Sequence, residues 1–403
     1  MIQEILELQK NLREKRFEFC SKHLKKDKKI IYFAYGMLQK KYIYSTFNIW
    51  YALNKFSDKY KVIIGGVGES QNDINKEDIL IPSKFQSGDE TVLPKTIDYL
   101  VLPFVNYDIK KNIEKIRKQN KNIIICYQVD FDFTDIASKN KELKTYQDNK
   151  EIIFENIRLV DKVIFNNENL CNFFIKNKEK YKLDGCETSG VFVKPFVNLE
   201  IFKNIKDNKP EKKKDDPKRI GILCTKENGE DLFFYKKVWQ SISDKFKEKV
   251  DFQLYGNKNN SIGKSFAKIK TDFTQQTGIS SYYNEIFNLN LDCVIIPTKD
   301  NSWNNNNYDL ERVIEFQSLG IPVLVSKIDP IKKIIVDEKN GFLHTDRDHL
   351  IRQLTVICEM DNSLDSSNML KKISLEAFHN ITENLDISKD NNIKKIEERI
   401  FEV

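Results

Sequence analysis

Two carboxylates at helical spacing, Glu311 and Glu315, are the residues of this chain that most suggest binding chemistry. They lie in "ERVIEFQSLGIPVLVS" (311–326), where a helical apolar pattern ends at a glycine and a proline before a short apolar strand. A spacing of four places both side chains on one helical face. A solvated face would explain Glu311 alone. Glu315 precedes a helix-to-strand turn of a parallel sheet, where ligands gather near strand carboxyl ends and helix amino ends, so it is a candidate ligand-binding residue.

A second acidic pair, Asp130 and Asp132, flanks Phe131 in "CYQVDFDFTDI" (126–136). Asp130 could be a polar residue contacting a substrate at the end of a strand, or it could cap a turn or helix. The Asp-x-Asp pattern also allows a metal interpretation, because paired carboxylates bind Mg²⁺ or Mn²⁺. The chain has four histidines, and no Ser/His/Asp or Cys/His arrangement indicates nucleophilic catalysis.

The elements that must position these residues alternate between short apolar strands and helix-length polar segments. Several strands are apolar at consecutive positions, as expected when helices cover both faces of a parallel sheet. The pattern predicts strands at 29–36, 60–68, 98–104, 122–130, 162–167 and 191–198, and then at 219–225, 251–256, 292–298, 321–326 and 341–345. The alternation occurs twice, so we expect an α/β protein with two doubly wound, Rossmann-like domains that face a central cleft.

The domain boundaries follow from changes in composition. A charged stretch with prolines at 206–218 cannot build a core and is expected to be a linker. It separates a first domain at 29–205 from a second domain at 219–370. Residues 1–28 have an amphipathic helical pattern, and helices at 371–403 are expected to cross back to the first domain.

Composition indicates a cytoplasmic protein without a membrane-spanning segment. The 403 residues include 66 basic and 60 acidic side chains, a net charge of +6 that permits anionic substrates or peripheral membrane contact. No apolar run approaches the roughly 20 residues of a spanning helix, and the N-terminus is too charged for a signal peptide. The seven cysteines form no CxxC pair or zinc-ligand spacing, so we expect reduced thiols.

A resemblance to a known family is carried by residues 297–343, "PTKDNSWNNNNYDLERVIEFQSLGIPVLVSKIDPIKKIIVDEKNGFL". This segment resembles the donor-binding region of GT-B glycosyltransferases of the family-4 type (glycosyl transferases group 1). Pro297-Thr298 resembles the strand end of that region, and Glu315 stands at the second glutamate of the Glu-x7-Glu motif. The stretches 320–323 and 340–343 resemble the Gly-x-Pro-Val and Asn-Gly-hydrophobic motifs that follow.

The resemblance implies a donor site in the second domain and an acceptor site in the first. Glu315 would hold the ribose of a nucleotide-diphosphate sugar, since a carboxylate can accept hydrogen bonds from a diol on two oxygens. Backbone amides at the start of the helix would meet the diphosphate. The donor-binding residues implied in this way are Thr298, Asn307, Tyr308, Asp309, Leu310, Glu311 and Glu315, with Gly256 at the end of a neighbouring strand.

Two positions depart from the family pattern. Asn307 stands where the family has the first glutamate, so it could hydrogen-bond sugar hydroxyls but adds no negative charge. The family's Arg-x4-Lys pair is poorly kept, and Lys226 is the nearest cation, either a diphosphate contact or a solvated lysine. These departures bear on sugar choice and on activity.

In the first domain, Gly36 is what remains of a glycine-rich loop common in the family, and Lys40 and Lys41 follow it. They could contact an anionic acceptor, although Gly36 could equally be a simple turn residue. "YQVD" (127–130) weakly resembles a strand end of phage DNA α-glucosyltransferases, where an aspartate lies near the acceptor. On this basis Asp130 is the catalytic candidate and Gln128 a residue of the acceptor cleft.

The expected function is transfer of a sugar from a nucleotide-diphosphate sugar to an acceptor hydroxyl, with no cofactor. The scarcity of histidine suits retention, in which the leaving diphosphate helps to take the acceptor proton; an inverting enzyme would need a general base, with Asp130 first in line. GT-B enzymes usually act without metal, so we expect none. The acceptor is expected to be a cell-surface glycan, lipid or other glycoconjugate. The alternatives are a phage-type DNA-base glycosyltransferase and a catalytically degenerate GT-B protein that binds a nucleotide or a partner.

Overall fold

The computed structural model describes 28–36, 53, 56–67, 97–134, 141–180, 183, 188–197, 199, 216–224, 236–256, 286–301, 304–305, 308, 310–360 and 369–401. The chain divides into two compact units, which are Met1–Asn198 with Ile387–Val403, and Leu199–Asp386. The helix expected at 1–28 and the linker expected at 206–218 lie outside the described residues, apart from Lys28 and 216–218.

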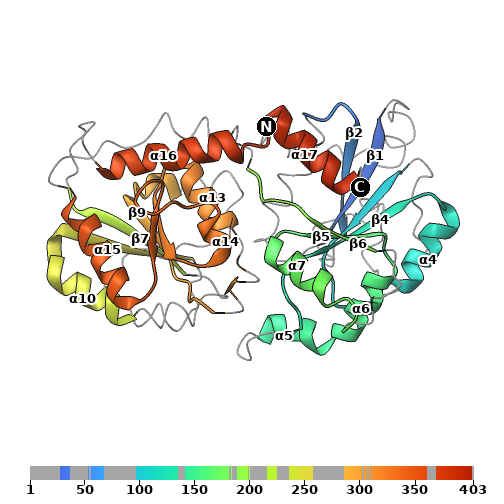
Figure 1. Ribbon diagram of the computed structural model, residues 1–403, viewed down its shortest axis with the longest axis horizontal. Coiled ribbons are helices and arrows are strands. Elements are labelled where there is room, and N and C mark those ends of the chain that lie inside the picture. The colour runs from blue at the N-terminus through green and yellow to red at the C-terminus, as the bar shows by residue number, and fades with distance from the viewer. Residues whose placement is uncertain are drawn as a thin grey trace, which may run out of the picture. The chain divides into compact units, whose positions relative to one another are not determined.

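Unit 1 is built on a parallel sheet of six strands in the order β2-β1-β3-β4-β5-β6 (Figure 1). Every pair of neighbouring strands is parallel. The strands are β1 (Lys29–Gly36), β2 (Tyr60–Val67), β3 (Tyr99–Leu102), β4 (Ile124–Val129), β5 (Lys162–Phe165) and β6 (Ser189–Phe192). The helices are α4 (Lys110–Gln119), α5 (Lys141–Asp148), α6 (Lys150–Arg158), α7 (Glu168–Lys176) and α17 (Asp390–Phe401).

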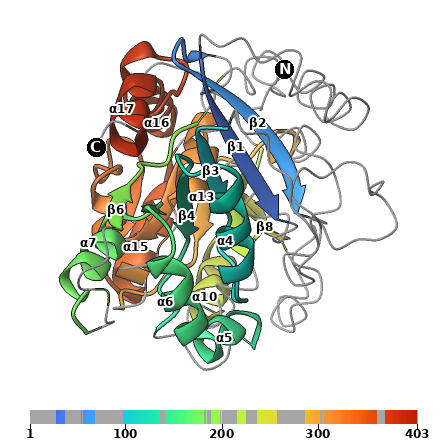
Figure 2. The ribbon, with the colours of Figure 1, turned by 90° about the vertical axis from the view of Figure 1, so that its right-hand side faces the viewer.

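Helix α17, from the far end of the chain, completes the core of unit 1 (Figure 2). Its apolar face packs on one face of the sheet, where the Phe401 ring lies 4.4 Å from Tyr60 and 4.6 Å from Tyr99. The buried Lys162 ammonium donates to the carbonyl of Ile400 at 2.8 Å, which satisfies a carbonyl of the last helical turn. The sheet residues on the opposite face meet other helices, as where Phe165 contacts Phe174 of α7.

Unit 2 has a parallel sheet of five strands in the order β11-β10-β9-β7-β8. The strands are β7 (Lys218–Cys224), β8 (Val250–Gly256), β9 (Cys293–Ile296), β10 (Val323–Ser326) and β11 (Phe342–His344). The helices are α10 (Lys236–Phe246), followed by a 3-10 turn at Lys247–Lys249, then α13 (Glu311–Ser318), α14 (Asp329–Lys332), α15 (Arg347–Glu359) and α16 (Met369–Asn384). Helices α10 and α15 share a core with one face of the sheet, and α13 contacts β9, β10 and α16.

The predicted fold class is confirmed, because a strand occurs in each predicted interval of both sheets. The sixth strand begins two residues before its predicted start and ends at Phe192. Of the C-terminal helices expected at 371–403, α16 lies in unit 2, and the chain enters unit 1 at Ile387, where its N–H donates to Val197 O.

Three aspartates lock the register of neighbouring parallel strands. Asp98, Asp161 and Asp292 each immediately precede a strand, namely β3, β5 and β9. Their carboxylates accept from the backbone N–H of Ile30 at 2.7 Å, Ile125 at 2.7 Å and Arg219 at 2.8 Å, respectively. In each case the aspartate's own N–H donates to the carbonyl of the same opposing residue. Each aspartate therefore satisfies both backbone groups of one residue at the amino edge of its sheet.

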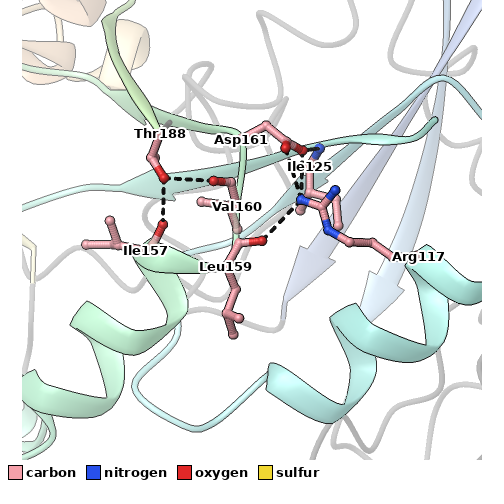
Figure 3. A network of polar contacts seen from close by, with 7 residues as sticks. All are labelled: Arg117, Ile125, Ile157, Leu159, Val160, Asp161 and Thr188. Carbon is pink, nitrogen blue, oxygen red and sulfur yellow. Dashed lines mark hydrogen bonds and ion pairs between the residues drawn. The ribbon is translucent and has the colours of Figure 1, made fainter. Parts of the chain in front are cut away.

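A polar network around Asp161 extends this lock to the helices of unit 1 (Figure 3). Arg117 of α4 donates to both carboxylate oxygens of Asp161 at 3.0 Å and to Leu159 O at 3.2 Å. The hydroxyl of Thr188, just before β6, donates to Val160 O at 2.8 Å. The network joins α4, the carboxyl end of α6 and the start of β6 at the amino edge of the sheet. The carboxyl ends of the strands take no part in these contacts.

Within the described part of the chain, no helix combines the length and apolar character needed to cross a membrane.

Replacing Asp98 by alanine is expected to destabilise unit 1 by about 1–2 kcal/mol, because the Ile30 N–H loses its charged acceptor. This corresponds to a fall in Tm of roughly 3–6 °C for a unit of this size. Asp98→Asn keeps an oxygen acceptor and should lose less than half as much. Scanning calorimetry of both variants checks the expectation, and equal losses would contradict a role for the acceptor oxygen.

Candidate donor and acceptor sites

Both sheets have a point where the order of strands reverses, and ligands of doubly wound sheets bind outside the carboxyl ends of the strands near such points. The reversal lies between β1 and β3 in unit 1 and between β7 and β9 in unit 2. Gly36 is the last residue of β1, and Gly256 is the last residue of β8, which pairs with β7. Gly36 therefore lies at the carboxyl end of a strand that borders the reversal in unit 1. Gly256 lies at the carboxyl end of a strand that is one place away from the reversal in unit 2.

Asp130 and Gln128 lie at the carboxyl end of β4. Gln128 is in the strand and pairs in register with Ile164, while Asp130 is the first residue after the strand. Both side chains are partly exposed, whereas Tyr127 and Val129 between and beside them are fully buried. The alternation of strand residues thus brings a carboxylate and an amide to the same edge of the sheet.

The Tyr127 hydroxyl fixes the loop that follows β3 by hydrogen bonds to its backbone. It donates to Val105 O at 2.6 Å and accepts from Val105 N at 3.1 Å, which satisfies both backbone groups of a buried residue just beyond β3. Burial raises the pKa of Tyr127, so the phenol remains protonated. The tyrosine of the "YQVD" resemblance therefore has a core role in this chain.

Asn156, a fully buried residue of α6, holds the rest of the same loop. Its amide oxygen accepts from Ile109 N at 3.2 Å, and its amide nitrogen donates to Tyr107 O at 2.8 Å. A buried side chain that satisfies two backbone groups fixes the path between β3 and α4. The loop beside Asp130 is thus held at Val105, Tyr107 and Ile109.

An aromatic cluster includes Phe131, the residue that follows Asp130. The Phe104 ring lies 5.0 Å from Phe131 and 4.9 Å from Tyr146 of α5, and Phe131 lies 5.1 Å from Tyr146. Such edge and tilted contacts add to the area that the rings bury. Burial raises the pKa of Tyr146, and the charge of Asp130 raises it further, so the phenol and this carboxylate are electrostatic neighbours.

Asp132 is used within its own turn. Its Oδ1 accepts from Thr134 N at 2.8 Å and from Thr134 Oγ1 at 2.6 Å, and the residue is buried. Asp130 and Asp132 thus have different surroundings. In the described ranges, no group of three or more His, Cys, Asp or Glu side chains is arranged to hold a metal ion.

In unit 2, Glu311 and Glu315 are both buried in α13, with exposed fractions of 7% and 4%. The solvated interpretation of Glu311 is wrong, because Glu311 itself is buried, as are Val313 to Ser318 of the same helix. The Glu315 Oε2 atom lies 2.6 Å from Nη1 of Arg312 in the preceding turn. Glu315 is therefore a buried carboxylate with a cationic partner.

Two of the described residues just before α13 have backbone hydrogen bonds. Leu310 is the N-cap residue, with φ −73° and ψ −8°, and its carbonyl accepts from Ile314 N at 3.0 Å. The Tyr308 N–H donates to Asn304 O at 3.0 Å, so this amide already has a backbone acceptor. The first three N–H groups of α13 have no carbonyl within the helix to bind.

The carboxyl ends of β9, β10 and β11 bring Thr298, Ser326 and His344 to one edge of the sheet. All three are buried. The Ser326 hydroxyl donates to Thr298 O, and the Thr298 hydroxyl donates to Ile296 O at 3.2 Å. Burial lowers the pKa of His344 to about 4, with the charge of His349 as the second cause, so the imidazole is neutral near pH 7.

The Asn340-Gly341 motif has a structural explanation. The Asn340 side chain accepts from Val336 N at 2.7 Å and donates to Ile334 O at 2.9 Å, which closes the turn before β11. A Cβ on Gly341 would lie 3.2 Å from Val323 O and 3.1 Å from Ile335 Cγ2. The Asn340-Gly341 part of the resemblance is therefore explained by turn formation and close packing.

The structure brings the expected residues together in two groups, one per unit. Gly36, Gln128 and Asp130 lie at strand ends of unit 1, whereas Gly256, Thr298, Tyr308, Leu310, Glu311 and Glu315 belong to unit 2. Lys40, Lys41, Lys226, Asn307 and Asp309 lie outside the described residues.

Sequence reasoning missed Arg312, Tyr146 and His344. Only Arg312 could have been found from the sequence, because its i,i+3 spacing to Glu315 permits an ion pair on a helix.

Neither a protein-family model nor a curated protein matches this sequence. The structure is similar to a glycosyltransferase from Rickettsia africae, with a TM-score of 0.57 and 14% identity over 94% of this chain and 100% of that one. It is also similar to Anabaena HepE in complex with UDP and glucose, with a TM-score of 0.58 and 12% identity over 93% and 100%. The match to TarM has a TM-score of 0.48 and 14% identity over 75% of this chain, and it spans about half of TarM, 54%.

The similarity to glycosyltransferases at such low identity establishes the fold. The chain has the GT-B fold, with two Rossmann-like units in series, and the fold expected from residues 297–343 is confirmed.

Tyr127→Phe is expected to destabilise unit 1 by about 1–3 kcal/mol, because both backbone groups of Val105 lose their partner in a buried site. Urea unfolding measures the change. Asn106→Ala is the control, since it removes an exposed hydrogen bond to Thr145 from the same loop and should change stability by less than about 0.5 kcal/mol. Equal changes in the free energy of unfolding of the two variants would contradict a structural role for the Tyr127 hydroxyl.

The buried neutral His344 predicts a pH dependence of stability. Unfolded histidine takes up a proton near pH 6.5, whereas the folded side chain does so only near pH 4. The contribution of neutral His344 to the free energy of unfolding is therefore fully present above pH 6.5. It is lost as the pH falls towards 4, at up to about 1.4 kcal/mol per pH unit. His344→Gln should flatten this part of the stability curve in urea unfolding at several pH values. An unchanged slope would contradict the assignment.

Proposed function

We propose that the protein is a glycosyltransferase that moves a sugar from a nucleotide-diphosphate sugar to an acceptor hydroxyl. The observation that carries the proposal is Glu315, a buried carboxylate on α13 in the second unit of a GT-B fold, within a segment that resembles donor-binding regions. Burying a charged group costs free energy even when it is paired, so a carboxylate retained there suits a polar ligand.

The donor would lie at the carboxyl edge of the unit 2 sheet. Glu315 would accept hydrogen bonds from the two ribose hydroxyls. The diphosphate would meet the amino end of α13, whose first N–H groups and dipole favour an anion. Since the Tyr308 N–H already donates to Asn304 O, the amides from Leu310 onwards are the better diphosphate donors. Lys226 and Asn307 are proposed to contact the diphosphate and the sugar.

The acceptor would bind at the strand ends of unit 1. Asp130, with Gln128 beside it, would orient the acceptor hydroxyl, and Gly36, Lys40 and Lys41 would line the same end. We propose retention, with the departing diphosphate taking the acceptor proton, and no metal ion. The amino end of α13 would then stabilise the charge that develops on the leaving group.

The acceptor class proposed is a glycan, lipid or other glycoconjugate. The structure of Anabaena HepE is a complex with UDP and glucose. Because this chain has a similar fold, we propose that it also binds a sugar. Transfer to hydroxymethylated DNA is the competing outcome. It would be recognised by affinity for duplex that falls steeply with salt concentration.

The first test is a thermal-shift screen of the purified protein with UDP-, GDP- and ADP-sugars, with and without Mg²⁺. A ligand that binds only the folded state raises stability by RT ln(1 + [L]/Kd), so one nucleotide family should raise Tm without metal. Glu315→Gln should weaken that donor by about tenfold or more, since two hydrogen bonds to a charged acceptor are weakened. Glu376→Gln, an exposed change on α16, is the matched control and should have no effect.

Asp130→Asn should leave donor affinity unchanged and lower the rate of transfer by about 10²-fold, because the acceptor hydroxyl loses the carboxylate that orients it. No Tm shift with any donor would reject the enzyme in favour of a degenerate GT-B protein. A shift that requires Mg²⁺ would contradict metal independence.

A further inference from the structure

The Arg312–Glu315 ion pair is unusual for its place in the helix. The side chains are 17% and 6% exposed and their charged atoms are 2.6 Å apart. Arg312 is the second residue of α13, where the helix dipole disfavours a cation. The order is also the less favourable one, because an acidic residue preceding a basic one stabilises a helix better than the reverse. Helix stability alone therefore gives a poor reason for this arginine.

The charges around the pair give a better reason. Glu311 and Glu315 are both buried and lie one turn apart on the same helix, so their charges repel each other. Burial of an unpaired carboxylate is strongly unfavourable, and pairing with hydrogen bonding is what makes it tolerable. Arg312 supplies a planar donor group that also fixes the direction of the carboxylate it binds.

We propose that Arg312 is a positioning residue for donor binding, which holds the Glu315 carboxylate aligned as the acceptor for the ribose hydroxyls. This inference rests on the proposed function. Arg312 acts through Glu315, and it does not itself contact the diphosphate.

A double-mutant cycle tests this role. Dissociation constants for Arg312→Gln, Glu315→Gln and the double variant are measured with UDP, GDP and ADP, their nucleosides, and inorganic pyrophosphate. Arg312→Gln should weaken the nucleoside and the nucleoside diphosphate by the same factor, about tenfold, and leave pyrophosphate unchanged. In the Glu315→Gln background, loss of Arg312 should cause no further weakening, because residues that act as one unit are not additive.

Two variants guard against a merely structural effect. Arg312→Lys keeps the charge and should restore part of the affinity, while any change in turnover should appear in the KM for donor and not in kcat. Lys332→Gln breaks an exposed i,i+3 pair with Asp329 at 2.5 Å in the same unit, and it should leave all affinities unchanged. Circular dichroism and Tm confirm that each variant is folded.

The outcomes separate the inference from the proposed function. If the wild-type protein binds no nucleotide, the proposed function fails and the inference fails with it. If the wild-type protein binds and Arg312→Gln binds equally well, only the inference is overturned. Weakening of pyrophosphate and nucleoside diphosphate but not of nucleoside would also overturn it, since Arg312 would then be a diphosphate contact.

Discussion

The whole arrangement depends on how the parallel strands are held at their amino edges. Asp98, Asp161 and Asp292 each bind both backbone groups of the residue opposite, in both units. A parallel pair that slipped by one residue would turn its apolar side chains to the wrong face. These contacts fix the pairs β1–β3, β4–β5 and β7–β9, and the carboxyl ends of β1, β4 and β9 carry or precede the candidate residues Gly36, Asp130 and Thr298.

At the carboxyl edge of unit 1, buried polar groups hold loops that cannot pair with the sheet. Tyr127 and Asn156, both buried, satisfy backbone groups between β3 and α4, and the Tyr127 ring contacts Phe104. A fully satisfied polar network in an apolar setting is rigid. Asp130 therefore follows a strand whose neighbouring loop is held by buried hydrogen bonds, which is consistent with the orienting role proposed for it.

The sequence predicted the strands because each is a short apolar run between turn residues, and it indicated Glu315 as a donor-binding candidate because the resemblance over 297–343 brackets it. It could not show that Glu311 is buried, since helical spacing gives the face of a side chain but not what covers it. Arg312 was missed for a similar reason: a cation on an amphipathic helix normally points to water, and only the packing of α13 shows otherwise. The aspartates before β3, β5 and β9 recur in "IDYLVL", "VDKVIF" and "LDCVII", a signal that becomes readable once the strand pairing is known.

The return of α17 to unit 1 has a consequence for biosynthesis. Unit 2 is continuous from Leu199 to Asp386, whereas the core of unit 1 includes side chains from 387 onwards, among them Ile393 and Phe401. A ribosome delivers these residues after all of unit 2 has emerged, since domains fold as their residues become available. Unit 1 therefore completes this core only after unit 2 has been made, and part of its apolar surface lacks its final cover until then.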